Sequence, residues 1–361
     1  METIQTVRSS YREQEVRFLL KDISGADLEQ KTEDREKQMQ TGGHYSESLP
    51  IEYQPSPEYI ALFHESLERH KLKLAEAVRT AAEKIRAEKG DHIVLVSLAR
   101  AGTPVGILIK RYLAHAFNIE VPHYSVSIIR GRGLDLNALS YIVKKHGAAA
   151  VQFVDGWTGK GAVTKELMSS VAEFNASRGT GVSASLAVLA DPGECADIYG
   201  TREDFLIPSA CLNSTVSGLV SRTVLNADLI GPDDFHGAKY YREFEAADLS
   251  NDFIDKVTAG YPATTGLESS SLPKTWNGLR DIEKVQALFG IENINLIKPG
   301  VGETTRVLLR RVPWKILVKD AENPELKHIL YLAEERGVPV ETYSDMTYSC
   351  MGLIQRVGGE Q

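Results

Sequence analysis

The sequence has few cysteines and no long hydrophobic run. Its three cysteines, Cys195, Cys211 and Cys350, are scattered through 361 residues and form no Cys-x-x-Cys pair. They cannot close an even set of disulfides, which excludes a disulfide scaffold and a cysteine zinc site and is typical of a reducing compartment. No apolar stretch approaches the ~18 residues of a membrane span, and the N-terminal segment 1–17 is too polar for a signal-peptide core. We therefore expect a cytoplasmic protein without a membrane partner.

The chain also lacks the positive net charge of proteins that coat nucleic acids. Lys and Arg number 41 against 49 Asp and Glu, a formal net charge of -8. Binding to RNA or DNA would therefore need a local basic surface. With 42% hydrophobic and 25% charged residues the composition is that of a globular protein, and the length suggests two domains.

Strand and helix patterns alternate through the middle of the chain. Short apolar β-rich runs occur at 93–98, 125–129, 150–154, 185–190 and 205–208, and helical periodicity at 57–89, 105–117 and 162–174. The alternation predicts an α/β fold with a mainly parallel sheet and helices on both faces. We expect an N-terminal arm (1–56), this sheet domain (57–260), a linker (261–280) and a small C-terminal α/β domain (281–361) with one βαβ unit. The linker composition predicts few contacts across the boundary.

A glycine-rich loop follows the predicted strand 150–154. Its sequence is Asp155-Gly-Trp-Thr-Gly-Lys-Gly161, and a predicted helix comes next. Glycines let backbone amides approach a ligand, and the start of a helix favours an anion, so the loop predicts a phosphate site. It is not a Walker loop, because Val154 and Gly161 stand where that motif needs Gly and Ser or Thr. An ordinary strand-to-helix turn is the alternative.

Two further loops combine arginine with glycine after predicted strands. Arg100 and Gly102 precede Pro104, which can begin a helix, so this loop is a second anion-ready helix start. Arg130 and Arg132 alternate with two glycines after the next strand, the composition of a mobile basic lid. A solvated loop explains the second pattern equally well.

These motifs resemble those of type I phosphoribosyltransferases. The Arg100 loop is similar to their pyrophosphate loop, and segment 153–161 to their phosphoribosyl-pyrophosphate loop. Five longer stretches are EKQMQTGGHYSE, LVSLARAGTPVGILIKR, VQFVDGWTGKG, IPSACLNSTVSGLVSRTV and KPGVGETTRVLLRRVPWKILV. Together they resemble phosphoribosyltransferase-like proteins with a C-terminal Pelota-type RNA-binding domain from bacterial tellurite-resistance and stress clusters. That family is also named StiP and labelled a cysteine protease.

The resemblance implies a glycosyltransferase that displaces pyrophosphate from a phosphoribosyl donor, bound with Mg²⁺, to make or break a nucleoside-like bond to a base-like acceptor. Catalysis would fall to Asp155, Arg130 and Arg132. The phosphoribosyl group would be held by Asp155, Gly156, Trp157, Thr158, Gly159, Lys160 and Gly161. Pyrophosphate would be received by Arg100, Ala101, Gly102 and Thr103. Gly156 replaces the second acid of the family pattern, which favours a first alternative, a non-catalytic nucleotide-sensing RNA-binding protein.

Polar residues after the last predicted strand of the sheet domain allow further interpretations. A tentative acceptor pocket consists of Asn213, Ser214, Thr215 and Ser217, although such residues also serve as caps and turns. Cys211 with His236 gives a second alternative, a cysteine protease or thiol hydrolase. A lone cysteine is more often a small buried apolar residue, and nothing local marks this one as a thiolate. Asp233, Asp234 and His236 fit a polar turn after Pro232 better than a metal site.

The C-terminal segment carries a surplus of cations inside an acidic protein. Between positions 298 and 319 the only acid is Glu303, and the cations are Lys298, Arg306, Arg310, Arg311, Lys315 and Lys319. The segment resembles the Gly-Glu-x-x-basic turn of Pelota domains, which implies that structured RNA is bound by Gly302, Glu303, Thr305, Arg306, Arg310 and Arg311. A solvated amphipathic helix is the alternative. A homodimer is left open.

Overall fold

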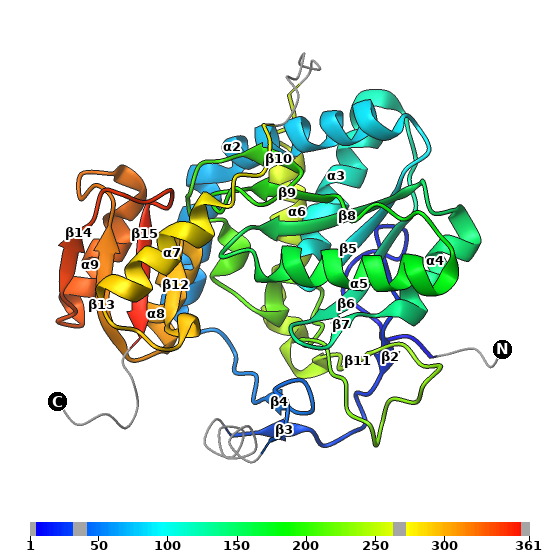
Figure 1. The fold of residues 1–361 in the computed structure, drawn as a ribbon, viewed down its shortest axis with the longest axis horizontal. Coiled ribbons are helices and arrows are strands. Elements are labelled where there is room, and N and C mark those ends of the chain that lie inside the picture. The colour runs from blue at the N-terminus through cyan, green and yellow to red at the C-terminus, as the bar shows by residue number, and fades with distance from the viewer. Residues whose placement is uncertain (1–4, 32–41, 263–271, 355–361) are drawn as a thin grey trace.

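The computed structural model describes residues 5–31, 42–262 and 272–354, and a mainly parallel sheet forms its centre (Figure 1). Its strands, in spatial order, are β1 (Arg17–Phe18), β6 (His123–Ile129), β5 (Val94–Ala99), β8 (Val151–Trp157), β9 (Leu186–Ala190) and β10 (Ile198–Thr201). All neighbours on this path are parallel. Only the short β7 (Gly133–Leu134) pairs antiparallel, with β6.

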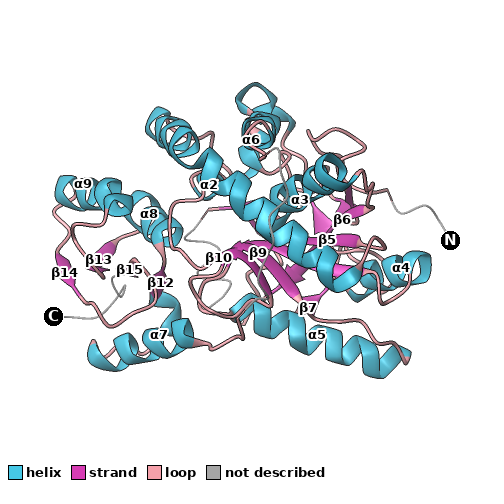
Figure 2. Ribbon diagram, turned by 90° about the horizontal axis from the view of Figure 1, so that it is seen from above, coloured by secondary structure: helices cyan, strands magenta, loops and turns pink. Residues whose placement is uncertain are grey.

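Helices cover both faces of this sheet, as the alternating pattern predicts (Figure 2). The helices α2 (Pro57–Lys89) and α3 (Gly102–Phe117) pack on one face, with α6 (Ser250–Thr258) on top of them; α4 (Leu136–His146) and α5 (Ala162–Arg178) pack on the other. The strands are therefore buried on both sides, which explains the nearly continuous apolar run VLVSLA of β5. No helix in the described part of the chain is long and apolar enough to cross a membrane.

The strand order places two of the predicted loops beside each other. From β5 the chain passes to β6 on one side, whereas β8, β9 and β10 follow on the other side. The loops after β5 and β8 therefore diverge at neighbouring strand ends, which is where ligands bind in open parallel sheets. Gly102 shows how close the two loops are: a Cβ there would lie 2.4 Å from the carbonyl oxygen of Val154.

Two local expectations differ from the structure. The strand expected at 205–208 is absent; the segment is a loop that enters the 3-10 turn η1 (Pro208–Ala210), and the last strand of the sheet is β10. Pro208 has no N–H to give to a ladder, which suits the first position of a turn. The expected lid at Arg130 and Arg132 is the tip of the β6–β7 hairpin. Its backbone donates to the Tyr45 hydroxyl and to the Glu166 carboxylate.

The N-terminal segment is built into the sheet domain. β1 extends the edge of the central sheet beside β6, and β2 (Lys21–Asp22) pairs with β11 (Gly237–Ala238). A further pair joins β3 (Glu29–Gln30) to β4 (Leu49–Pro50). The short apolar stretch at 16–20 is buried in the process, so it supplies core residues rather than surface.

A second, four-stranded sheet forms the C-terminal α/β region. Its order is β12 (Ile297–Pro299), β15 (Cys350–Ile354), β13 (Pro313–Val318) and β14 (Val340–Thr342), with α8 (Val301–Arg310) and α9 (Lys327–Glu335) on one face and α7 (Asn277–Leu288) on the other. β13, α9 and β14 form the predicted βαβ unit, since the two strands are parallel. The central antiparallel strand β15 was missed.

The two regions share one hydrophobic core, so the prediction of few contacts between them is wrong. Val301, Leu308 and Ile329 belong to the same buried cluster as the residues of α2 and α3. Asp204 of the sheet domain accepts the backbone N–H of Val301 at 2.9 Å and that of Ser349 at 2.8 Å. The physical reason is the apolar surface of α8 and α9, which a domain this small cannot bury by itself.

Candidate functional site

A cavity of about 320 Å³ lies where the loop after β8 meets the C-terminal region. The sheet domain contributes Ala101, Arg130, Asp155 and the segment 157–164 to its wall. The C-terminal region contributes Ile297, Lys298, Pro299, Glu303 and Arg306. The structure thus brings together the glycine-rich loop and the basic segment, two motifs that lie about 140 positions apart in the sequence.

A second cavity of about 210 Å³ continues the first along α8. Lys298, Glu303 and Arg306 line both cavities, and Asn213, Val307 and Arg311 complete the second. We call the two together the interdomain groove. Five cations and two acids line it, so the groove carries a surplus of positive charge: Arg130, Lys160, Lys298, Arg306 and Arg311 against Asp155 and Glu303.

The cations of the groove act on one another. Burial, together with the charges of Lys298 and Arg130, lowers the pKa of Lys160 to about 8, while Glu303 acts in the opposite direction. Burial also lowers the pKa of Lys298, with Arg130 and Arg311 acting in the same direction and Glu303 opposing them. Partly buried cations held this close favour an anionic ligand that would neutralise them.

Asp155 is the acid at the floor of the groove, near the carboxyl end of β8. Burial raises its pKa to about 7, while the backbone N–H of Gly156, which donates to its Oδ1 at 2.8 Å, acts in the opposite direction. The carboxyl group therefore keeps its proton to a higher pH than an exposed aspartate does. It can donate a hydrogen bond to a ligand as well as accept one.

The glycine-rich loop is docked onto the C-terminal region. Lys160 Nζ donates to the carbonyl oxygen of Ile294 at 2.9 Å and lies 3.1 Å from Asn295 Oδ1, and the Tyr348 hydroxyl donates to the Gly159 carbonyl. Gly161 has a φ of +79°, and a Cβ there would lie 2.5 Å from the Trp276 ring. The loop is consequently one wall of the groove, with its amides close to α5, rather than an open cradle.

The predicted pyrophosphate loop largely turns away from the groove. Arg100 Nη1 donates to the Val220 carbonyl at 3.3 Å, and Thr103 is buried with its hydroxyl 2.8 Å from that of Ser125. Gly102 packs against β8, and only Ala101 lines the groove. The peptide between Ala99 and Arg100 is cis. Arg100 and Lys160 are therefore engaged in separate contacts and do not face one cavity.

Several other predicted site residues have structural roles. Arg132 is paired with Glu47 at 3.3 Å and does not line the groove, unlike Arg130. In the tentative acceptor set, the Ser214 hydroxyl donates to Glu52 at 2.7 Å, and that of Ser217 donates to the Asn213 carbonyl. Ser214, Thr215 and Ser217 are buried. Of this set, only Asn213 reaches the groove, so caps and turns explain the hydroxyl-rich stretch.

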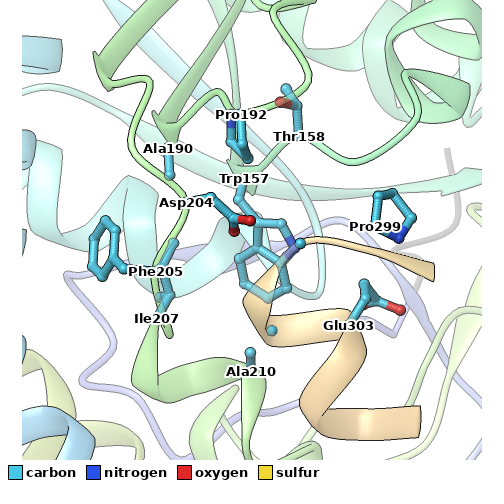
Figure 3. A pocket seen from close by; sticks show the side chains of 12 residues that line it. Trp157, Thr158, Ala190, Pro192, Asp204, Phe205, Ile207, Ala210, Pro299 and Glu303 are labelled. Atoms are coloured by element: carbon cyan, nitrogen blue, oxygen red, sulfur yellow. The ribbon is translucent and has the colours of Figure 1, made fainter. Parts of the chain in front are cut away.

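Trp157 lies between the groove and a small cavity of about 10 Å³, which has room for about one water molecule. Figure 3 shows its indole between Asp204 and Glu303, above Ala210. Thr158 also lines this cavity, and its hydroxyl donates to Asp191 at 2.7 Å. Thr158 and Trp157 both line the two spaces, and the hydrogen bond of Thr158 to Asp191 also holds the loop in place.

The predicted RNA-binding residues divide between the groove and the domain junction. Glu303, Arg306 and Arg311 line the groove. Gly302 packs on the sheet domain, where a Cβ would lie 3.2 Å from that of Ala210, and Thr305 is buried and bonded to Val301 and His328. The side chain of Arg310 lies outside the described residues. One face of α8 thus docks the C-terminal region, and its edge supplies the groove.

Lys298 was not among the predicted site residues, although it lines both cavities. It counted toward the local cation surplus, which was the available signal. Its place at the junction follows from the pairing of β12 with β15, a long-range contact that no local pattern reveals. Trp157, in contrast, was named as part of the glycine-rich loop 155–161.

The three cysteines are all buried, each with at most 1% of its surface exposed. Burial raises the pKa of Cys195 to about 11 and that of Cys350 well above its ordinary value. Cys211 ends the turn η1 inside the shared core. His236, its suggested partner, has Nδ1 2.9 Å from the Ser127 hydroxyl. Among the described residues no group of three or more His, Cys, Asp or Glu could hold a metal ion.

Comparison with known proteins decides the family. Residues 9–258 match the family model of the tellurite-like stress resistance cysteine protease StiP, and residues 276–356 match that of the PELOTA RNA-binding domain. The chain belongs to the StiP family. The cysteine protease StiP of Acinetobacter baylyi (strain ATCC 33305 / BD413 / ADP1) is 33% identical over 373 residues, which cover 98% of this chain and 96% of the relative.

The StiP match corrects the predicted activity. A phosphoribosyltransferase, and with it a glycosyltransferase using phosphoribosyl pyrophosphate, was wrong, because both the family and the relative are named as cysteine proteases. Of the two alternatives, the thiol hydrolase agrees with that name. Mg²⁺ was predicted as an ion that binds together with the phosphoribosyl donor. Without that donor, the reason given for Mg²⁺ no longer applies. The resemblance to a Pelota-containing stress-resistance family is confirmed.

Proposed function

We propose that this StiP-family chain binds RNA through the interdomain groove. The observation that carries the proposal is the surplus of cations, five against two acids, gathered from two regions of an acidic protein. RNA phosphates would replace water around Lys298, Arg306 and Arg311 and release counterions. The Pelota match over residues 276–356 independently supports RNA as the anion.

The proposal is tested by titrating a fluorescent structured RNA with the full chain at several salt concentrations. Lys298→Glu should weaken binding by about 30-fold and flatten its salt dependence, because it removes a phosphate contact and adds a repulsive charge. Lys319→Glu is the matched control, since Lys319 is exposed at the far end of β13 and outside the groove. Equal losses in both variants would mean that net charge, not the groove, governs binding.

Thiol hydrolysis is the second candidate function, and the names of the family and of the relative favour it. Cys211 is its best position in this chain, because the turn that it ends packs against α8 across the domain junction. Separation of the two regions would uncover this turn, whereas burial raises the pKa values of Cys195 and Cys350 and so disfavours their thiolates. Hydrolysis of a fluorescent casein by the full chain, lost in Cys211→Ala and retained in Cys195→Ala, would establish it.

The remaining expectations stand as parts of this proposal. The neighbouring loops after β5 and β8 support a phosphoribosyltransferase-like type for the sheet domain, as a fold without that activity. A cytoplasmic location agrees with an RNA partner and with the scarcity of cysteine. The homodimer, and Mg²⁺ at this site, stay predictions.

A further inference from the structure

We infer that the interdomain groove takes the end of a single RNA strand, with its last base stacked on the Trp157 indole and its phosphate held by Lys298 and Arg306. The inference rests on the proposed RNA binding and specifies which part of the RNA enters. The recognised chemistry is one nucleotide unit with a phosphate. It can come from a strand end or from a free nucleotide, and the experiment below separates these sources.

The dimensions of the groove favour a single strand. Its inner part has about 320 Å³, which suits one small ligand. Its outer part, about 210 Å³, runs along the edge of α8 toward Arg311 and shares Lys298 and Arg306 with the inner part. A strand can therefore pass along α8 and end inside, whereas an A-form duplex is too wide to follow it.

Trp157 forms the end wall of this path. It lines both the inner groove and the narrow 10 Å³ cavity next to it, whose volume leaves no room for a nucleotide beyond the indole. An aromatic side chain at the end of a basic groove is the usual platform for an unpaired base. The wall is firm because Trp157 packs against the shared hydrophobic core.

Arg306 lies over the ring of this platform and is held in place. Its guanidinium carbon lies 5.7 Å from the Trp157 ring centroid, its Nε donates to the Ala210 carbonyl at 2.8 Å, and its Nη1 lies 3.0 Å from Glu303. Two fixed contacts orient the guanidinium, so it can bind a phosphate without first losing conformational freedom. Lys298 lines both parts of the groove and supplies the second phosphate contact.

The acids of the groove limit how much negative charge can enter. Asp155 lies on the floor and Glu303 is paired with Arg306, so both would oppose a chain of several phosphates at the inner end. The cations are spread along the whole path from Arg130 to Arg311. This distribution fits one phosphate inside and further phosphates along α8, as an RNA strand presents them.

The test compares the full chain with Trp157→Ala, Trp157→Phe and Trp314→Ala. The probes are a fluorescent ten-nucleotide single strand carrying a phosphate at its unlabelled end, the same sequence as a blunt duplex, and adenosine monophosphate. Trp157→Ala should weaken single-strand binding at least tenfold, Trp157→Phe should stay within about threefold of wild type, and Trp314→Ala should bind normally. Trp314 is the matched control because it is exposed and lies outside the groove.

A second measurement covers the case in which Trp157→Ala fails to fold. Hydroxyl-radical footprinting of the wild-type chain should show Trp157 protected by the single strand, with Trp314 unchanged. Wild type that binds no RNA of any form would overturn the proposed function itself. RNA binding that is indifferent to Trp157, without its protection, would overturn this inference alone. Adenosine monophosphate bound through Trp157, with strand binding unaffected, would also overturn it in favour of a free nucleotide.

Discussion

The interdomain groove and the three cysteines differ in every property that decides reactivity. The groove is open and lined by five cations, and burial lowers the pKa values of Lys160 and Lys298 toward the range where they respond to a ligand. The cysteines are buried, and burial raises the pKa values of Cys195 and Cys350. The first region is ready to bind, and the second would have to open before it reacts.

This difference separates the two candidate functions by what each requires of the fold. RNA binding uses side chains that already face the groove. Thiol chemistry requires the junction between η1 and α8 to part, against the shared core and the Asp204 contacts to Val301 and Ser349. The two candidate functions of a StiP-family chain can therefore be distinguished by measuring whether its cysteines become as accessible to solvent as the cations of the groove.

Thiol accessibility gives the largest expected effect. In the folded chain all three cysteines should react with a thiol reagent such as dithiobisnitrobenzoate at least about a thousandfold more slowly than in guanidinium chloride, because reaction waits for opening of the core. The time course of thionitrobenzoate release measures this. One equivalent of fast-reacting thiol in the native protein would contradict the difference in accessibility between the cysteines and the groove, and it would favour the hydrolase.

Arg311→Ala should give the next largest effect. Arg311 is exposed at the outer end of the groove, so its loss should lower affinity for structured RNA about fivefold. The slope of log affinity against log salt should fall by about 0.7. Fluorescence titrations between 50 and about 200 mM salt, the range over which such slopes are measured, test this prediction, with Lys319→Ala as control. An unchanged slope would place the RNA elsewhere.

Asp155→Asn should have a smaller effect that depends on pH. The folded-state pKa of Asp155 is about 7 against an ordinary 3.8, so its stabilising contribution is present below pH 4 and is lost as pH rises through 7. The variant should therefore melt at a higher temperature than wild type at pH 8 and gain nothing at pH 4. It should also bind RNA about threefold more tightly at pH 8, because one negative charge leaves the groove. Thermal melts and titrations at both pH values measure this, and an equal gain in melting temperature at pH 4 would contradict the assigned cause.

Cys211→Ala should have the smallest effect on binding. The side chain is buried, so its loss should cost about 1 kcal/mol of unfolding free energy, while RNA affinity stays within twofold of wild type. Urea unfolding and RNA titration provide the two measurements. A tenfold change in RNA affinity would show that the groove and the core around Cys211 are coupled.

Much of the fold could be predicted from the sequence because its signals are local. The apolar runs of β5, β8 and β9 and the helices α2, α3 and α5 have the periodicity of buried elements, and the structure places each of them within a few residues of the prediction. The strand expected at 205–208 failed because an apolar run before proline is compatible with a buried loop. β15 was missed because it is stabilised by two partners distant in sequence.

The candidate site was predicted only in part, for the same reason. The loop 155–161 was found from its glycines, and Arg306 and Arg311 from the local cation surplus. That Arg100 bonds to Val220, while Arg130 faces the groove, depends on segments packed from elsewhere in the chain. Lys298 was counted in the local cation surplus but not named as a site residue, because its place in the groove depends on the long-range pairing of β12 with β15.

By itself the sequence determined the scarcity of cysteine and the position of the basic segment, because composition carries these properties. It also determined the division into two regions and the order in which loops follow the parallel strands, because short periodicities carry these. Only the tertiary structure decided that the basic segment meets the glycine-rich loop and that one face of α8 packs against the sheet domain. It also decided that Trp157 forms the end wall of the groove. A surplus of charge is a property of a segment, whereas its availability depends on what the rest of the chain packs against it. The apolar faces of α8 and α9 had to be covered, and covering them placed Lys298 and Arg306 opposite Asp155.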